Sequence, residues 1–457
     1  MFLHDIEITS DRPLLIFPEG ECLSPRELNV WTTCAESEIW ISQIRGARVG
    51  LCCKDNGLIA LMFLLLDGIA ARVTLLPSDL APETLTALSS GSGVEILVSD
   101  RPDAAAIGIP LAPLPPPLSA QFSISANITA PSTFNTEWVL PTSGTTRTPK
   151  LVAHTINTLA RTVKRDPQKG AGIRWGLLYD LNRFAGLQVY LQALLGGAAL
   201  IIPRSGASLE DTLAAFTAAG CNALSATPTL WRKILMTPRS KELPLRLITL
   251  GGEIADQSIL SALAASFPSA RVTHIYASTE AGVGFSVTDG QEGFPATFLQ
   301  GTLNGVNLRI SPEGILELRP TVGGQHYLGE NSPLAHEDGF VSTGDRVRIK
   351  NDRVYFLGRD SGAINVGGNK VQPEKVESIL LSHPAVAMAS VTAKRSGITG
   401  SLVVARLILH PNPTGAKVTP SEIREWCSSR LDRFEVPALI RIVADLELNA
   451  SGKLSRN

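Results

Sequence analysis

The chain has 457 residues, of which 41 are Lys or Arg and 42 are Asp or Glu, so its charges nearly cancel. This balance provides no electrostatic footprint for nucleic acid or for an anionic membrane surface. The length exceeds what one hydrophobic core supports, and we expect two or three domains.

Membrane insertion, secretion and disulfide bonding are not expected. No stretch reaches the roughly 18–20 uninterrupted apolar residues that a membrane span needs; the longest candidate, 58–66, is followed by Asp67. The N-terminus lacks a basic region followed by a long apolar one, so no secretory signal is visible. The six cysteines form no CxxC pair and no cluster with histidine, which predicts reduced, buried thiols and a cytoplasmic protein.

Short apolar runs alternate with helical patterns in the first 100 residues. The predicted strands are 48–53, 71–76 and 94–98, and the predicted helices are 56–67 and 83–88. Strand, helix and strand at this spacing form βαβ units, which favour a parallel sheet that helices cover on both faces. The segment 110–131, rich in Pro, Ser and Ala, is interpreted as an extended loop.

A loop rich in hydroxyl groups follows, Pro141-Thr142-Ser143-Gly144-Thr145-Thr146-Arg147-Thr148-Pro149-Lys150. Hydroxyls and backbone N–H groups in a tight loop form a concave, donor-rich surface, to which the lysine adds a positive charge. Such a surface suits a polyanion, in the first place nucleotide phosphates. It is not the common P-loop, because no second glycine precedes the lysine and no Ser or Thr follows it. By composition alone, a solvated turn is an equally good interpretation.

Strands and helices continue to alternate up to residue 275. The predicted helices are 156–164, 185–195, 209–219 and 257–266, and the predicted strands are 176–180, 198–202, 223–226, 245–250 and 272–275. This rhythm describes a large α/β domain, in which ligands bind at the carboxyl ends of the strands. The turns Gly251-Gly252-Glu253 and Tyr276-Ala277-Ser278-Thr279-Glu280 stand at such ends.

The pattern changes at about residue 298 to short alternating strands with Asn-Gly, Glu-Gly and Asp-Gly turns, which predicts a β-rich subdomain up to about residue 356. A small α/β pattern then begins, with predicted helices at 371–381 and 423–431 and strands at 387–392 and 402–409. We therefore predict an α/β fold with a large N-terminal domain of βαβ layers, residues 1–358, and a small α+β C-terminal domain.

Five motifs in chain order resemble those of the adenylate-forming enzymes, the superfamily of acyl- and aryl-CoA synthetases, adenylation domains and luciferases. The resemblance covers nearly the whole chain. Four motifs follow the loop before Lys150: Tyr276-Ala277-Ser278-Thr279-Glu280, Ser342-Thr343-Gly344-Asp345-Arg346, Gly358-Arg359-Asp360-Ser361-Gly362 with the glycine-rich run up to Pro373, and Asn449-Ala450-Ser451-Gly452-Lys453. The resemblance implies that residues 363–457 form a mobile lid and that 359–362 form its hinge.

The first motif is similar to the phosphate-binding loop of that family. The resemblance implies that the following residues surround the β- and γ-phosphates of ATP: Thr142, Ser143, Gly144, Thr145, Thr146 and Lys150. The chain departs from the family pattern at Arg147 and Leu151, where glycine is usual. Arg147 then either touches pyrophosphate or points to solvent.

The second motif is similar to Tyr-Gly-x-Thr-Glu of the family. The resemblance implies that Tyr276 stacks on adenine, that Thr279 donates to the α-phosphate, and that Glu280 holds a partly hydrated Mg²⁺. Taken alone, Thr-Glu is also an ordinary helix start. We include the turn Gly251-Gly252-Glu253 in the expected nucleotide site.

The third and fourth motifs are expected at the ribose and at the hinge. Asp345 would accept from both ribose hydroxyls, although a turn aspartate in a hairpin is the alternative. Arg359 would reach ribose or phosphate. The family places an acidic hinge residue where this chain has Ser361, so the pivot is left open between Asp360 and Ser361. Lys370 stands where many relatives have arginine, which keeps the charge and loses bidentate geometry.

The last motif makes Lys453 the expected catalytic lysine. An isolated Gly-Lys near a C-terminus is usually a frayed tail. As the last of five ordered motifs, it would approach the carboxylate and α-phosphate when the lid closes, stabilise the pentavalent phosphorus and exclude water.

We therefore expect an ATP-dependent carboxylic acid ligase that forms an acyl-adenylate and then a thioester, with ATP, Mg²⁺ and CoA as cofactor or co-substrate. One alternative is a stand-alone ligase that loads a carrier protein. Another is a non-catalytic regulator that binds nucleotide or acyl-adenylate, which the departures at Arg147, Leu151, Ser361 and Lys370 motivate. The oligomeric state is not readable.

The acid itself is not identified by the sequence. The expected pocket is apolar and of modest size, which suits an aryl or a short-to-medium acyl acid, and its candidate residues are Asp180, Phe184, Gly186, Thr227, Gly282 and Phe285. Asp180 lies where some relatives hold an aspartate that pairs with a substrate amine. It either indicates an amino-acid substrate or caps a turn at a strand end.

Overall fold

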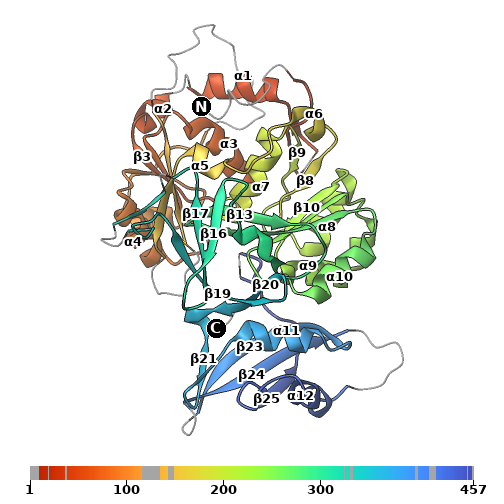
Figure 1. Cartoon of the computed structure of the whole chain (residues 1–457). Coiled ribbons are helices and arrows are strands. Elements are labelled where there is room, and N and C mark those ends of the chain that lie inside the picture. The colour runs from red at the N-terminus through yellow and green to blue at the C-terminus, as the bar shows by residue number, and fades with distance from the viewer. Residues whose placement is uncertain are drawn as a thin grey trace.

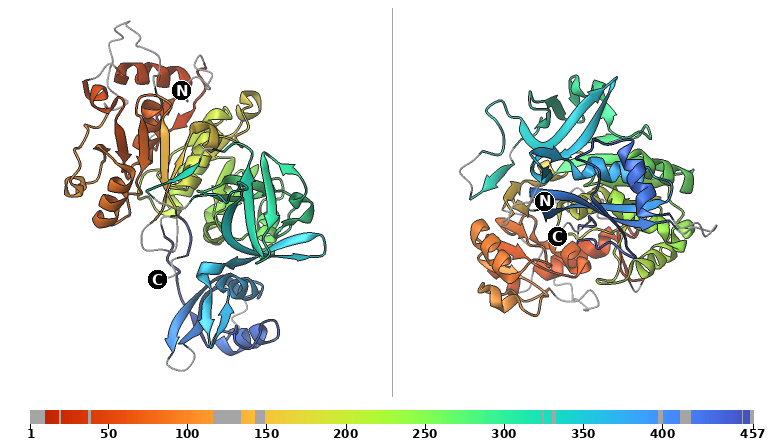
Figure 2. Two further views of the ribbon diagram at one scale, coloured as in Figure 1. Left: turned by 60° about the vertical axis from the view of Figure 1, so that its left-hand side comes forward. Right: turned by 90° about the horizontal axis from the view of Figure 1, so that it is seen from below.

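The computed structural model describes residues 10–18, 20–36, 39–115, 134–142, 149–323, 325–329, 333–396, 400–410, 418–449 and 451–454. These residues form a large N-terminal domain of mixed α/β structure and a smaller C-terminal domain, as predicted (Figure 1). The C-terminal domain lies at one end of the molecule in every view from the side (Figures 1 and 2). No helix in the described part of the chain has the length and apolar character that crossing a bilayer would require.

An eight-stranded sheet forms one half of the N-terminal domain. Its spatial order is β13 (Gly282–Val287), β12 (Arg271–Ser278), β11 (Leu247–Gly251), β10 (Ala223–Ala226), β8 (Arg174–Gly176), β9 (Ala199–Ile201), β1 (Leu15–Ile16) and β2 (Cys22–Leu23). Only the edge strands β13 and β2 run antiparallel to their neighbours. The connecting helices are α7 (Phe184–Leu195), α8 (Leu209–Ala218), α9 (Pro228–Met236) and α10 (Gln257–Ser266).

A six-stranded sheet forms the other half. Its order is β18 (His326–Leu328), β7 (Leu151–His154), β6 (Glu137–Pro141), β4 (Arg72–Leu75), β3 (Arg48–Leu51) and β5 (Ile96–Val98). The strands β6, β4, β3 and β5 are parallel, which confirms the predicted βαβ unit. The helices of this half are α1 (Pro25–Glu36), α2 (Ile39–Ile44), α3 (Asn56–Leu66) and α4 (Pro82–Ser92).

Two apolar helices, α3 and α7, pack between these sheets. Phe63 of α3 stacks on Trp138 of β6 with 4.8 Å between ring centroids, and it lies 5.3 Å from the ring of Tyr190 on α7. The Tyr190 hydroxyl donates to the carbonyl of Ala60 over 2.7 Å, so its polar end is satisfied inside the core. This packing fixes the position of the two sheets relative to each other.

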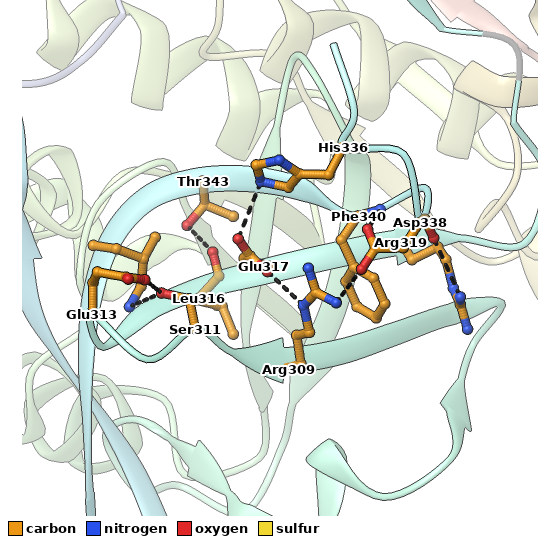
Figure 3. Close-up of polar contacts among 11 residues, drawn as sticks. Arg309, Ser311, Glu313, Leu316, Glu317, Arg319, His336, Asp338, Phe340 and Thr343 are labelled. Atoms are coloured by element: carbon orange, nitrogen blue, oxygen red, sulfur yellow. Dashed lines mark hydrogen bonds and ion pairs between the residues drawn. The ribbon is translucent and has the colours of Figure 1, made fainter. Parts of the chain in front are cut away.

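The β-rich region forms a third, antiparallel sheet with the order β14 (Phe294–Pro295), β20 (Arg353–Arg359), β19 (Val341–Lys350), β17 (Ile315–Pro320), β16 (Val306–Ile310) and β15 (Thr302–Leu303). Figure 3 shows the buried carboxylate of Glu317 between the side chains of Arg309 and His336. It accepts from Arg309 over 2.5 Å and lies 3.2 Å from Nε2 of His336. The hydroxyl of Thr343 donates to Leu316 O over 2.7 Å, which holds β19 against β17 directly before Gly344 and Asp345.

The C-terminal domain has its own core. It consists of the hairpin β21 (Ile364–Val366) and β22 (Asn369–Val371), the sheet β23 (Val386–Ser396), β24 (Gly400–Leu409) and β25 (Leu439–Ile442), and the helices α11 (Pro373–Leu381) and α12 (Pro420–Ser428). Its buried cluster includes Val376, Leu380, Val391, Leu407 and Ile423. The domain boundaries 1–358, 359–362 and 363–457 stay a prediction.

Many predicted elements have other bounds than the observed ones, and three of these differences involve contacts near the site. The helix predicted at 156–164 ends after one turn as α5 (Ile156–Leu159), and the chain then turns so that Arg161 reaches distant carbonyls. The strand predicted at 176–180 stops at Gly176, because the side chain of Asp180 accepts from the backbone of Asn182 and closes a turn. The strand predicted at 272–275 extends to Ser278, because its last residues pair with β13.

The helix α9 was not predicted. Its start was interpreted only as the end of a strand, yet Thr227 caps the helix by accepting from Leu230 N, and Pro228 occupies its first turn. Trp231 and Ile234 are buried and form part of the apolar face of this helix. The sequence Thr-Pro followed by this periodicity was the available signal.

Candidate active site

A cavity of about 1400 Å³ lies where the N-terminal sheets, the β-rich sheet and the C-terminal domain meet. It brings together most of the residues that the sequence predicted: Thr142, Asp180, Phe184, Thr227, Gly251, Gly252, Glu253, Tyr276, Thr279, Glu280, Phe285, Asp345, Arg359 and Lys453. The predicted residues that do not line it are Lys150, Gly186, Gly282, Asp360, Ser361 and Lys370. Ser143, Gly144, Thr145 and Thr146 lie outside the described residues, as does Arg147.

Lys453 enters this cavity from the C-terminal domain. A Cβ atom at Gly252, whose φ is +80°, would stand 3.3 Å from Lys453 Cε. Burial lowers the pKa of the Lys453 ammonium; the nearby carboxylate of Glu253 opposes that shift, and the positive charge of Arg359 adds to it. Lys453 of the C-terminal domain therefore lies close to Gly252 and Glu253 of the N-terminal domain and to the charge of Arg359.

Direct contacts between the domains hold this arrangement. Thr227, at the start of α9, donates from its hydroxyl to the carbonyl of Gly452. Lys233 of the same helix pairs with Asp445 of the C-terminal domain over 2.9 Å. The helix α9 of the N-terminal domain thus contacts the C-terminal domain at Asp445 and at Gly452, the residue before Lys453.

Tyr276, Asp345 and Arg359 form one hydrogen-bonded group. The Tyr276 hydroxyl donates to Asp345 Oδ2 over 2.5 Å, and Arg359 Nε donates to Asp345 Oδ1 over 3.0 Å. Burial opposes the charge of Arg359, but the carboxylate of Asp345 outweighs this and raises the pKa of the guanidinium. The Tyr276 ring lies nearly parallel to the rings of Phe285 and Phe356, each 5.2 Å away. Stacking of Tyr276 on adenine stays a prediction.

Thr279 and Glu280 form the turn between β12 and β13. Within the described residues, neither the Thr279 hydroxyl nor the Glu280 carboxylate makes a hydrogen bond or an ion pair, and both residues line the cavity. No group of three or more His, Cys, Asp or Glu suited to a metal ion occurs in the described ranges.

Lys150 directly precedes β7, the strand whose last residue, His154, contacts this turn. Its backbone N–H donates to the hydroxyl of Thr142 over 3.2 Å, which closes the ends of the predicted phosphate loop. Its ammonium lies 4.6 Å from the ring centre of Tyr327, an aromatic residue that β18 brings beside β7.

Three predicted site residues help to form the local structure around the cavity. Glu253 accepts from Thr229 N over 2.9 Å and so caps α9. A Cβ at Gly186 would lie 2.3 Å from the carbonyl oxygen of Asp180, so this glycine permits close packing of α7. Gly282 has a φ of +72°, which the turn after Glu280 requires.

Asp180 lies beside the positive charge of Arg183. Burial raises the pKa of its carboxyl, and Arg183, whose Nε lies 3.7 Å from Asp180 Oδ2, opposes that shift. Arg183 also pairs with Asp79 over 2.6 Å. Together with the turn hydrogen bond to Asn182, these contacts support the interpretation of Asp180 as a turn residue.

The hinge candidates lie on a short helical turn, Asp360–Gly362, outside the cavity. Asp360 accepts from Arg346 over 2.8 Å and lies 3.7 Å from Lys370. The preceding Gly358 has a φ of +128°, and a Cβ there would stand 2.6 Å from a carboxylate oxygen of Glu374 on α11. The contact between the domains at this point requires glycine.

Among the residues near the cavity that were not named as candidates are His154, Arg161, Arg183 and Tyr327. His154 and Arg161 follow Lys150 and bond to the backbone of the Thr279–Val283 turn. A histidine inside an apolar strand was the available signal for the first. No local signal identified the other three, because their partners lie far away in the sequence.

Comparisons with known proteins find similar sequences over most of the chain. The sequence profile of a family described as AMP-binding enzyme matches residues 45–315, and that of the AMP-binding enzyme C-terminal domain matches residues 375–453. The chain is 28% identical over 346 residues to the 2-succinylbenzoate–CoA ligase of Bacillus subtilis, which covers 70% of this chain and 68% of that protein.

Two further relatives illustrate the range of similar proteins. Surfactin synthase subunit 1 of Bacillus subtilis is 26% identical over 377 residues, which is 74% of this chain but 10% of that protein. The crystal structure of ATP-bound MatB from Rhodopseudomonas palustris superimposes with a TM-score of 0.77 at 19% identity, covering 99% of this chain and 96% of that one.

Proposed function

Because this chain belongs to the family of AMP-binding enzymes, we propose that it joins a carboxylic acid to the thiol of CoA by way of an acyl-adenylate, at the expense of ATP. The observation that carries this proposal is the position of Lys453. It comes from the C-terminal domain and lies in the same cavity as Tyr276, Glu280 and Asp345.

Different residues would act on the reacting groups and on the departing phosphates. A carboxylate oxygen of the acid attacks the α-phosphorus of ATP, and the bond to pyrophosphate breaks. The ammonium of Lys453 would lie against both reacting groups and reduce the repulsion between them. Lys150 and the loop that begins at Thr142 would hold the departing phosphates. In the second step the CoA sulfur attacks the acyl carbon, and AMP leaves.

The nucleotide would be held by groups that are already ordered. Asp345 would accept from the ribose hydroxyls, with Arg359 beside it, in exchange for its present bond to Tyr276. Glu280 is a carboxylate without a described hydrogen-bond or ion-pair partner in the cavity, which fits one ligand of a hydrated Mg²⁺ bound with the phosphates. When bound, this ion would supply positive charge that neutralises the phosphates.

The acid would bind near α7, in a part of the cavity lined by Trp175, Phe184, Val189 and Ala198. These side chains support an aryl or a short-to-medium acyl acid. The pairing of Asp180 with Arg183 argues against an amino acid, because a substrate ammonium would compete with a guanidinium that is already present.

The experiment is pyrophosphate release with ATP and Mg²⁺ across aryl, fatty and amino acids, with and without CoA. Lys453→Ala should reduce release with the preferred acid by at least ~100-fold, since it removes a charge from the reacting atoms. Lys241→Ala, which removes an exposed lysine outside the cavity, serves as the matched control.

The outcomes separate the alternatives. Acid-dependent release with consumption of CoA supports the acyl-CoA ligase. Release that leaves CoA unchanged but acylates a carrier protein supports a carrier-loading ligase, the kind of role that the match to a surfactin synthase subunit suggests. Binding of ATP without release for any acid supports a nucleotide-binding regulator.

A further inference from the structure

The turn that carries Thr279 and Glu280 is fixed from behind by two side chains. His154, the last residue of β7, places Nε2 2.8 Å from the carbonyl oxygen of Thr279. Arg161 donates from Nη2 to the carbonyls of Val283 at 2.5 Å and of Ala281 at 3.5 Å. Both side chains come from the segment that begins with Lys150, and together they contact the backbone on both sides of Glu280.

The bond from His154 has a defined direction. A carbonyl oxygen only accepts, so Nε2 of His154 carries the hydrogen. Its other nitrogen lies 3.3 Å from the hydroxyl of Thr158. The imidazole is 1% exposed and its ring centre lies 6.3 Å from that of Phe184. Because it is enclosed on these sides, the ring cannot turn away from Thr279 without repacking.

Arg161 fixes a wider region. Its Nη1 donates to the carbonyls of Asn304 at 3.1 Å and Gly305 at 3.3 Å, so one guanidinium joins the end of β15 to the turn before β13. None of the described acidic side chains forms an ion pair with it. A planar group with donors in fixed directions sets the relative position of four peptide groups at once.

We propose that His154 and Arg161 are positioning residues, which hold the Thr279 hydroxyl and the Glu280 carboxylate at a fixed place relative to Lys150. This inference rests on the proposed function, because it assigns Glu280 to the magnesium–nucleotide complex. The side chains of Thr279 and Glu280 have no described hydrogen-bond partner of their own, so the position of their backbone decides where they point. A site held in this way binds its ligand without first paying the entropy of ordering the turn.

The test uses the full chain and measures binding of ATP by calorimetry, with Mg²⁺ and with a chelator. His154→Leu keeps the bulk and removes the donor. It should weaken binding of Mg²⁺–ATP by about 10-fold and leave binding of metal-free ATP within about 2-fold, because the loss of one buried hydrogen bond changes an equilibrium by this order. His154→Gln, whose amide can donate to the same carbonyl, should recover most of the affinity.

Two controls separate positioning from loss of stability. Tyr190→Phe removes another buried hydrogen bond to a carbonyl, at Ala60, and should leave Mg²⁺–ATP binding unchanged. In the double variant with Glu280→Gln, the loss from His154→Leu should largely disappear, because both act through the same carboxylate. Arg161→Met should behave like His154→Leu in both backgrounds.

Different results would contradict the positioning role and the proposed ligase activity. Wild-type affinity in His154→Leu, equal losses in the leucine and glutamine variants, or losses that add fully to that of Glu280→Gln would overturn the positioning role. Wild-type protein that binds Mg²⁺–ATP and never releases pyrophosphate would overturn only the ligase. Wild-type protein that binds no Mg²⁺–ATP would overturn both.

Discussion

The hydroxyl of Tyr276 donates a 2.5 Å hydrogen bond to the carboxylate of Asp345, although the two residues lie on different sheets. Arg359 donates to the other oxygen of the same carboxylate over 3.0 Å. The carboxylate is 16% exposed, so this group joins the eight-stranded sheet to the β-rich sheet at the edge of the cavity. A ribose bound at Asp345 must replace the tyrosine as donor.

Removing Asp345 should therefore weaken nucleotide binding strongly. We expect Asp345→Ala to raise the dissociation constant of ATP by about 10- to 100-fold, since hydrogen bonds to a charged acceptor contribute roughly 1.5–3 kcal/mol. Tyr276→Phe keeps the ring and releases one carboxylate oxygen, so ATP should bind as tightly as in the wild type or more tightly. Calorimetry measures both. Equal weakening in the two variants would show that the tyrosine hydroxyl itself contacts the nucleotide.

Gly252 should be required for the entry of Lys453. Gly252→Ala places a methyl group 3.3 Å from Lys453 Cε at a φ of +80°. We expect pyrophosphate release to fall by at least about 10-fold, and by a larger factor than ATP binding, because the lysine acts on the reacting atoms. Release is measured with the acid that the wild type prefers.

The matched control is Gly301→Ala. Gly301 has a φ of +77°, and a Cβ there would meet nothing within 4 Å. This variant carries the same backbone strain, of order 1 kcal/mol, without a neighbour to displace. Equal loss of release in both variants would mean that strain, and not the contact with Lys453, causes the effect.

The sequence predicted the fold class, and most of the candidate residues that it named line the cavity, because both depend on local pattern. Alternating strands and helices identified the α/β domain, and short motifs identified Tyr276, Glu280, Asp345 and Lys453, which the cavity contains. The predicted ends of helices and strands were less accurate. The strand β12 continues past its apolar core to Ser278 because β13 offers hydrogen bonds, and such pairing is not visible in the strand's own residues.

Residues that act through distant partners could not be predicted. Arg161 belongs to a segment that the pattern assigned to a helix, and its role follows from four carbonyls more than a hundred residues away. Arg183 is similar, because its contacts with Asp79 and Asp180 exist only after the two sheets have packed. Only the fold brings these charges to the cavity.

The charge of Lys453 should set an alkaline limit on the first half-reaction. Burial lowers the pKa of this ammonium, so the folded protein loses the proton below the ordinary lysine value of about 10.4. We expect pyrophosphate release to decline as the pH rises through that lowered pKa. Lys453→Arg should retain any residual activity to a higher pH, because arginine stays protonated. The same alkaline limit in both proteins would assign it to another group.

His154 should make the protein sensitive to mild acid. Burial lowers its pKa to about 4, from an ordinary value of about 6.5, so the folded protein keeps it neutral where the unfolded chain is protonated. Stability from this residue is fully present above about pH 6.5 and is lost as the pH falls toward 4. A difference of this size corresponds to about 3 kcal/mol in the free energy of unfolding.

The measurement is urea unfolding of wild type and His154→Gln between pH 7.5 and pH 4. Glutamine does not titrate, so the variant should lack this part of the acid sensitivity, while the carboxylates contribute equally to both proteins. We therefore expect the stability difference between the two proteins to shift by about 3 kcal/mol in favour of the variant as the pH falls. A difference that stays constant with pH would mean that the histidine is protonated in the folded protein. Such a proton would sit on Nδ1, which faces Thr158, and would leave the bond from Nε2 to Thr279 in place.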